Sequence, residues 1–125
     1  MGEINLHITE PIDCHLWKIR FPSVEDWPLD LKTLVVFEED VHFERSLKQC
    51  DCGQLYFYEM IEFIDFERGE DPIYRTLIPI ADEQTAVSLN SKSKFELINF
   101  LSLRYDWPNN EKNARVYWHN RSETF

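Results

Sequence analysis

The chain has 125 residues, of which 43% are hydrophobic and 14% aromatic, enough for one buried core and too few for two. It carries 23 acidic and 13 basic residues, and the resulting formal charge of -10 disfavours binding to phosphate backbones and to anionic lipid surfaces. We therefore expect a single domain, residues 1–125, that binds neither nucleic acid nor membrane and favours a basic protein as partner.

Export signals and membrane spans are not indicated. Glu3, His7 and Glu10 interrupt the first ten residues, and no later stretch approaches the roughly 20 apolar residues of a membrane span. The three cysteines are an odd number in such a chain, which argues against a disulfide framework. We expect a cytoplasmic protein with reduced thiols.

Several segments in the first two thirds of the chain have strand-like composition. Residues 33–37 and 41–45 are rich in β-formers, and residues 16–21 are a weaker candidate. Residues 54–66 are the strongest, because the alternate side chains on both of their faces are mainly apolar. Together with residues 73–80 they predict a central β-hairpin in an antiparallel sheet that is covered on both faces.

Helical signals follow the hairpin. Asp82 can cap a short helix that runs through Leu89, and Ser93 with Glu96 forms a capping-box pattern that predicts a helix over about residues 94–104. Residues 115–118 could add a final strand. The order of elements indicates an α+β fold: a mainly antiparallel sheet with a central hairpin at about 54–80 and one or two helices at about 82–104 packed on it.

The segment Cys50-Asp51-Cys52-Gly53 resembles the turn of a zinc knuckle, but its cysteines are closer together than zinc sites usually place them. The further ligands would have to come from Cys14, His15, His42 and His119, which form no second pair of the usual spacing. A β-turn with two packed thiols is the simpler interpretation. A redox role is another, although Asp51 should raise the thiol pKa values. We expect no metal and no cofactor.

Two glutamates lie within the most hydrophobic predicted strand. Burial would raise the pKa of Glu59 or Glu62, as a general acid requires, but in a regular strand the two side chains point to opposite faces. The structural alternative is ion pairs with Arg75 or Arg104, or exposure near an edge of the sheet. Nucleophile elbows, glycine-rich phosphate loops and HExxH pairs are absent from the sequence. We expect no catalytic residues and no enzyme.

Two acidic clusters lie beside aromatic residues, a mixture that is common in protein interfaces. Solvated loops are the alternative explanation. The predicted partner-binding residues are Glu67, Glu70 and Asp71 at the tip of the central hairpin, Glu38, Glu39 and Asp40, and the neighbouring Phe43 and Tyr74.

The stretch CGQLYFYE at residues 52–59, continued by residues 64–66 and 71–74, resembles a group of small bacterial proteins without an established activity. In size, acidity and aromatic content the chain is also similar to immunity proteins of contact-dependent growth-inhibition and polymorphic toxin systems. That resemblance implies a protein that binds a basic toxin domain, such as a nuclease, and occludes its active site. The alternatives are a small hydrolase or metal-dependent enzyme using Glu59, Glu62 and a histidine, and an adaptor for another partner.

Overall fold

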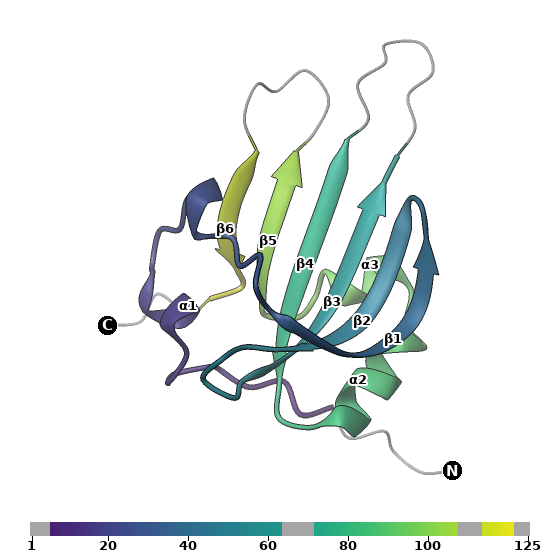
Figure 1. The fold of residues 1–125 in the computed structure, drawn as a ribbon, viewed down its shortest axis with the longest axis horizontal. Helices are drawn as coiled ribbons and strands as arrows, with labels where there is room; N and C mark the ends of the chain where they lie inside the picture. The colour runs from purple at the N-terminus through teal and green to yellow at the C-terminus, as the bar shows by residue number, and fades with distance from the viewer. Residues whose placement is uncertain (1–5, 64–71, 108–113, 122–125) are drawn as a thin grey trace.

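A single antiparallel sheet dominates the computed structural model, which describes residues 6–63, 72–107 and 114–121 (Figure 1). In these residues six strands follow one another across the sheet in chain order. They are β1 (Lys32–Asp40), β2 (Phe43–Gln49), β3 (Leu55–Glu62), β4 (Ile73–Ile80), β5 (Ser102–Trp107) and β6 (Arg115–His119). Each strand therefore pairs with the next one along the chain, the simplest antiparallel topology.

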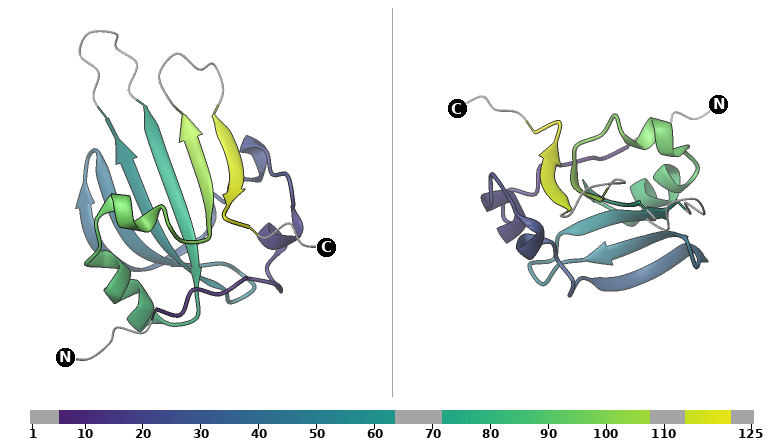
Figure 2. Two further views of the ribbon diagram at one scale, coloured as in Figure 1. Left: turned by 180° about the vertical axis from the view of Figure 1, so that it is seen from behind. Right: turned by 90° about the horizontal axis from the view of Figure 1, so that it is seen from above.

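In the described part of the chain, four short helical segments accompany the sheet: α1 (His15–Lys18), the 3-10 helix η1 (Val24–Asp26), α2 (Glu83–Asn90) and α3 (Lys94–Leu97). The views of Figure 2 place α2 and α3 on one side of the sheet, and α1 and η1 on the other. We call these two sides the helix face and the N-terminal face. Among the described residues, no helix is long and apolar enough to cross a membrane.

The helix face holds one of two buried clusters. Residues from β2, β3 and β4 pack there against α2 and α3, and the buried members are Leu47, Phe57, Ile78, Ile80, Ala86, Leu89 and Leu97. The helix α2 is anchored at its start, where the Asp82 carboxylate accepts the backbone N–H of Thr85 at 2.8 Å. This cap satisfies a backbone donor that the helix itself cannot pair.

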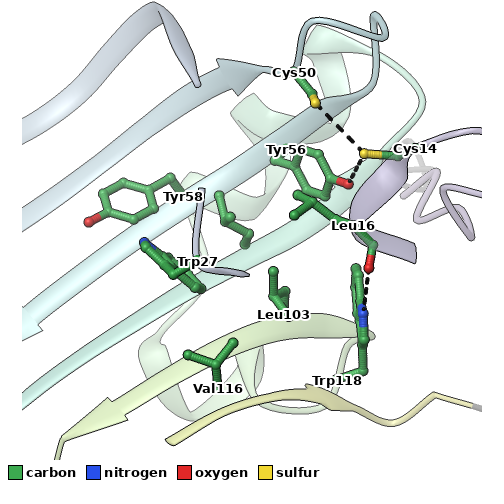
Figure 3. Packing of buried hydrophobic residues seen from close by; sticks show 10 residues of the cluster. Cys14, Leu16, Trp27, Cys50, Tyr56, Tyr58, Leu103, Val116 and Trp118 are labelled. Atoms are coloured by element: carbon green, nitrogen blue, oxygen red, sulfur yellow. Dashed lines mark hydrogen bonds between the residues drawn. The ribbon is translucent and has the colours of Figure 1, made fainter. Parts of the chain in front are cut away.

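The N-terminal face holds the other cluster, in which the segment before β1 covers the sheet (Figure 3). Its buried members are Cys14, Leu16, Trp27, Cys50, Tyr56, Tyr58, Leu77, Leu103, Val116 and Trp118. The Trp118 indole N–H donates to the backbone carbonyl of Leu16 at 3.1 Å and so fixes this segment against β6. A buried indole needs such an acceptor.

The predicted α+β class and central hairpin are confirmed. β3 and β4 pair in continuous register from Leu55 with Ile80 to Glu62 with Ile73. Neighbouring side chains of β3 point to opposite faces, and both Tyr56 and Phe57 are completely buried. β3 is thus an interior strand covered on both sides, as its two apolar faces indicate. Residues 64–66, which the sequence adds to this strand, lie outside the described residues.

The helix predicted over residues 94–104 is wrong in length. Its capping box exists, since the Ser93 hydroxyl accepts the Glu96 N–H and the Glu96 carboxylate accepts the Ser93 N–H. However, α3 ends at Leu97, and Ser102–Trp107 forms β5, which pairs with both β4 and β6. Backbone pairing on two sides and the burial of Leu103 outweigh the local helical preference. This strand was not predicted.

The weak strand candidate at residues 16–21 is also wrong. Its first half belongs to α1, and only Leu16 of that helix is buried. These residues form no strand because the segment lies across the N-terminal face and does not pair with an edge of the sheet (Figure 2).

Candidate functional site

The second predicted acidic cluster lies at the outer edge of the sheet. Glu38, Glu39 and Asp40 are the last three residues of β1, and all three side chains are exposed. β1 is the first strand of the sheet, so in the described part of the chain its outer edge pairs with no strand. The first cluster, Glu67, Glu70 and Asp71, lies outside the described residues.

Like charges face each other at this edge. Glu39 lies directly opposite Glu44 in the β1–β2 pair, an arrangement that destabilises a sheet. The Glu44 carboxylate accepts the Ser46 hydroxyl at 2.9 Å and lies 3.7 Å from the Lys48 ammonium. Glu39 has the more exposed side chain of the pair, so its negative charge faces the solvent.

The predicted aromatic residues lie in the same cross-strand row as this acidic edge. Asp40 pairs with Phe43, Phe43 with Ile61, and Ile61 with Tyr74. Side chains in register on neighbouring strands share one face, so the row lies on the helix face. The structure therefore brings together Asp40, Phe43 and Tyr74, and both aromatic side chains are half-buried.

The row leads into an open, largely apolar cavity of about 280 Å³ between the sheet and α3. Its lining residues are Glu59, Ile61, Phe63, Tyr74, Thr76, Lys94, Phe95, Leu97, Ile98 and Arg104. Phe95 is 71% exposed at its rim, and the Lys94 ammonium lies over the Phe63 ring at 4.7 Å. A concave apolar surface with a few polar groups is the usual form of a binding site.

Sequence reasoning missed this cavity. The sequence placed Phe95 and Ile98 in a helix over about residues 94–104, whereas α3 ends at Leu97 and both side chains are exposed. One signal in the sequence could have indicated the cavity: residues 95–103 contain more apolar side chains than a four-residue helix can bury.

Glu59 lines the cavity, is buried and forms an ion pair. Its carboxylate lies 2.7 Å from Arg45 Nη2. The sequence suggested Arg75 or Arg104 as the partner, and that suggestion is wrong for Glu59. Arg45 Nη1 also donates to the backbone carbonyls of Asn90 and Lys92, at 2.8 Å each. The pair therefore ties the α2–α3 connection to the sheet.

Glu62 lies on the opposite face from Glu59, as the strand alternation predicts. Its carboxylate is 2.7 Å from His42 Nδ1, a contact between the β1–β2 turn and the end of β3. The groups of the enzymatic alternative, Glu59, Glu62 and this histidine, are therefore not brought into one site.

Two thiols and one imidazole gather where the N-terminal segment meets the β2–β3 turn. The Sγ atoms of Cys14 and Cys50 are 3.8 Å apart, and Cys50 Sγ is 3.7 Å from His15 Nδ1. Cys52 lies two residues after Cys50 on the same turn, and its side chain is exposed. All three thiols are free.

The surroundings shift the pKa values of the Cys50 and Cys52 thiols in opposite directions. Burial raises the pKa of Cys50 to about 12. Burial would also raise the pKa of Cys52, but a hydrogen bond from the Gln54 backbone and those with Cys14 and Cys50 lower it below its ordinary value. The expectation that Asp51 raises both thiol pKa values is therefore wrong for Cys52.

Of the four further metal ligands that the sequence offers, the structure brings two to the Cys50 turn. Cys14 and His15 are adjacent in sequence and begin α1, which lies beside that turn. His42 is bound to Glu62, and His119 Nε2 lies 2.6 Å from the carbonyl of Ile98, away from the cluster.

Comparison of the chain with protein-family models, with curated proteins and with solved structures gives no match. Inferences about its function therefore rest on the geometry given above.

Proposed function

We propose that the protein is a binding module for a basic protein and acts as an immunity protein that blocks a toxin domain such as a nuclease. One observation carries the proposal. Asp40, at the acidic end of β1, shares a cross-strand row with Phe43 and Tyr74, and this row opens into the apolar cavity beside α3. We call the acidic end of β1, the row and the cavity rim together the binding surface.

The chemistry of this surface suits a protein partner. Interfaces concentrate their affinity in apolar or aromatic anchors that fill pockets, and surround them with polar or charged residues. The cavity offers the pocket, Phe95 and Ile98 are exposed at its rim, and Val41 at the β1–β2 turn is 80% exposed. Apolar side chains grouped in this way are the feature that marks an interaction site.

Charge favours a basic partner. A nuclease active site must be positive to hold phosphate, and carboxylates placed over it would compete with the substrate. Glu38 and Asp40 pair with Arg45 and Phe43 on the helix face, whereas Glu39 pairs with Glu44 on the other face and adds its negative charge at the edge of the sheet. The mechanism would be occlusion and would need no chemistry by this chain.

A growth-protection assay tests the proposal. The chain is co-expressed with the products of its neighbouring genes, and we expect it to restore growth against one toxic, basic product and to form a complex with it. Phe95→Asp should abolish protection without lowering the melting temperature, because its side chain is mostly exposed. The matched control is Val87→Asp, an exposed apolar position on α2 outside the cavity.

Two results would contradict the proposal. The first is that the wild-type chain protects against none of these products and binds none of them. The second is that Phe95→Asp and Val87→Asp protect equally well, which would place the contact surface elsewhere.

A further inference from the structure

Three potential metal ligands converge at the edge of the N-terminal face, although they come from two distant parts of the chain, and a fourth, Cys52, lies on the same turn as Cys50. Ligand atoms of Cys14, His15 and Cys50 all lie within 4.8 Å of one another. Figure 3 shows the Cys14 thiol lying between Cys50 and the hydroxyl of Tyr56. We propose that Cys14, His15, Cys50 and Cys52 bind a zinc ion in a tetrahedral site.

The distances agree with the edges of a zinc tetrahedron. Bonds of about 2.3 Å to sulfur and about 2.0–2.1 Å to nitrogen, at tetrahedral angles, separate two sulfurs by about 3.8 Å and a sulfur from a nitrogen by about 3.6 Å. The observed separations are 3.8 Å for Cys14 to Cys50 and 3.7 Å for Cys50 to His15 Nδ1. Two packed thiols alone would explain the first distance but not the convergence of the imidazole nitrogen.

Cys52 supplies the fourth ligand. It lies on the tight turn between β2 and β3, where the Gly53 N–H donates to the Cys50 carbonyl and the Cys50 N–H donates to the Gln54 carbonyl. Gly53 has φ +97°, a conformation that favours glycine and lets the turn fold back on itself. The Cys52 thiol is exposed and lies two residues after Cys50 on this turn, so we assign it the fourth position, on the solvent side of the three converging ligands.

The ligands also have the outer support that metal sites need. The Tyr56 hydroxyl donates to Cys14 Sγ at 3.1 Å from a completely buried position, and it thereby orients that sulfur. Hydrogen bonds of this kind fix the ligands of metal sites and tune their affinity. The exposed His15 and Cys52 leave a path by which the ion can enter.

A site with four protein ligands has no position for a substrate, so the ion would be structural. It would join the first turn of α1 to the β2–β3 turn and hold the N-terminal segment over the sheet. The binding surface lies elsewhere, on the helix face, so this inference is independent of the proposed function. It departs from the sequence-based expectation of no metal, because the sequence gives no sign that Cys14 and His15 lie beside Cys50.

Metal analysis of the full-length protein tests the inference directly. Protein purified without chelator from cells grown with zinc should contain one zinc per chain. Cobalt(II) added to the metal-free protein should give the visible absorption of a tetrahedral ion together with thiolate-to-cobalt charge transfer. Competition with a chromophoric chelator then gives the zinc affinity of each variant.

Cys52→Ser and His15→Gln replace exposed ligands, so both variants should fold. We expect each to weaken zinc binding by more than about 100-fold, beyond the 10–100-fold loss that is typical of outer-shell changes. Tyr56→Phe, which removes only the outer support, should weaken it by about 10-fold. The control is His7→Gln, whose histidine is hydrogen-bonded to Asp82 away from the site and whose loss should leave one zinc per chain.

The proposal is overturned if the wild-type protein holds no zinc under these conditions and its three thiols all react with a thiol reagent. A Cys14–Cys50 disulfide in freshly purified, zinc-free protein would overturn it in favour of a redox pair. Equal zinc affinity of the wild type and the two ligand variants would show that any bound metal lies elsewhere.

Discussion

Arg45 and Glu59 lie directly opposite each other on β2 and β3 and form an ion pair in which each side chain is only 7% exposed. Arg45 also donates to the carbonyls of Asn90 and Lys92 between α2 and α3. One buried pair thus links the central strands to the connection between the two helices, and its Glu59 lines the cavity. Its integrity matters for both the fold and the binding surface.

Removing one member of this pair should destabilise the protein strongly. Glu59→Leu leaves the guanidinium of Arg45 buried without its counter-ion, and we expect a loss of about 3–5 kcal/mol in the free energy of unfolding. The double variant Arg45→Met with Glu59→Leu should lose less than the single variant, because no charge stays buried. Urea unfolding of both variants measures this difference. A double variant less stable than Glu59→Leu would contradict the interpretation.

Phe57 tests the interior position of β3. Its side chain is completely buried on the helix face and packs with Phe37 at a ring distance of 6.1 Å, so Phe57→Ala should cost about 3–5 kcal/mol. Phe95→Ala is the control, because that side chain is mostly exposed and its truncation should cost less than about 1 kcal/mol. Denaturant melts that give similar losses for the two variants would be inconsistent with this packing.

The lowered pKa of Asp82 predicts that the free energy of unfolding falls in acid. Hydrogen bonds from His7 and from the Thr85 side chain and backbone lower the pKa of Asp82 from 3.8 to about 2. The folded state therefore binds this proton less readily than the unfolded state, so the contribution of the carboxylate is present above about pH 4. It is lost as the pH falls toward about 2.

Asp82→Asn isolates this contribution, because asparagine can still accept the Thr85 N–H but does not titrate. The wild type should be more stable than the variant at pH 5, and the difference should shrink as the pH falls from about 4 to about 2. Urea melts at several pH values measure it. A difference that stays constant over this range would contradict the assignment.

The elements that the sequence predicts well are those whose local pattern agrees with their tertiary surroundings. β3 has apolar residues on both faces and is buried on both, and Ile73–Ile80 forms the predicted strand with the same limits. β5 was missed because its residues follow a real capping box at Ser93 and share their apolar character with a helix. Only its pairing with β4 and β6 decides its conformation, and that pairing is not visible in local sequence.

The candidate sites were predictable only in part. Register places Asp40, Phe43 and Tyr74 in one row, and the sequence had already suggested all three as binding residues. The cavity depends on where α3 ends, and the thiol cluster depends on how the segment before β1 crosses the sheet. Both are consequences of long-range packing, which periodicity and spacing do not encode.

The central claim is that the acidic end of β1 guides a basic partner to the binding surface. Glu38→Lys with Glu39→Lys reverses two exposed charges there and keeps Asp40, whose carboxylate accepts the His42 N–H in the β1–β2 turn. Glu25→Lys with Glu83→Lys makes the same change in net charge at exposed positions in η1 and α2.

The most direct test is the rate of association of both double variants with the toxic partner, measured at low and at physiological salt. We predict that the β1 variant associates about 10-fold more slowly at low salt and loses most of its salt dependence, because charges at the rim of an interface act mainly on the encounter rate. The control variant should remain close to the wild type. Equal association rates for the two folded variants at both salt concentrations would contradict the claim.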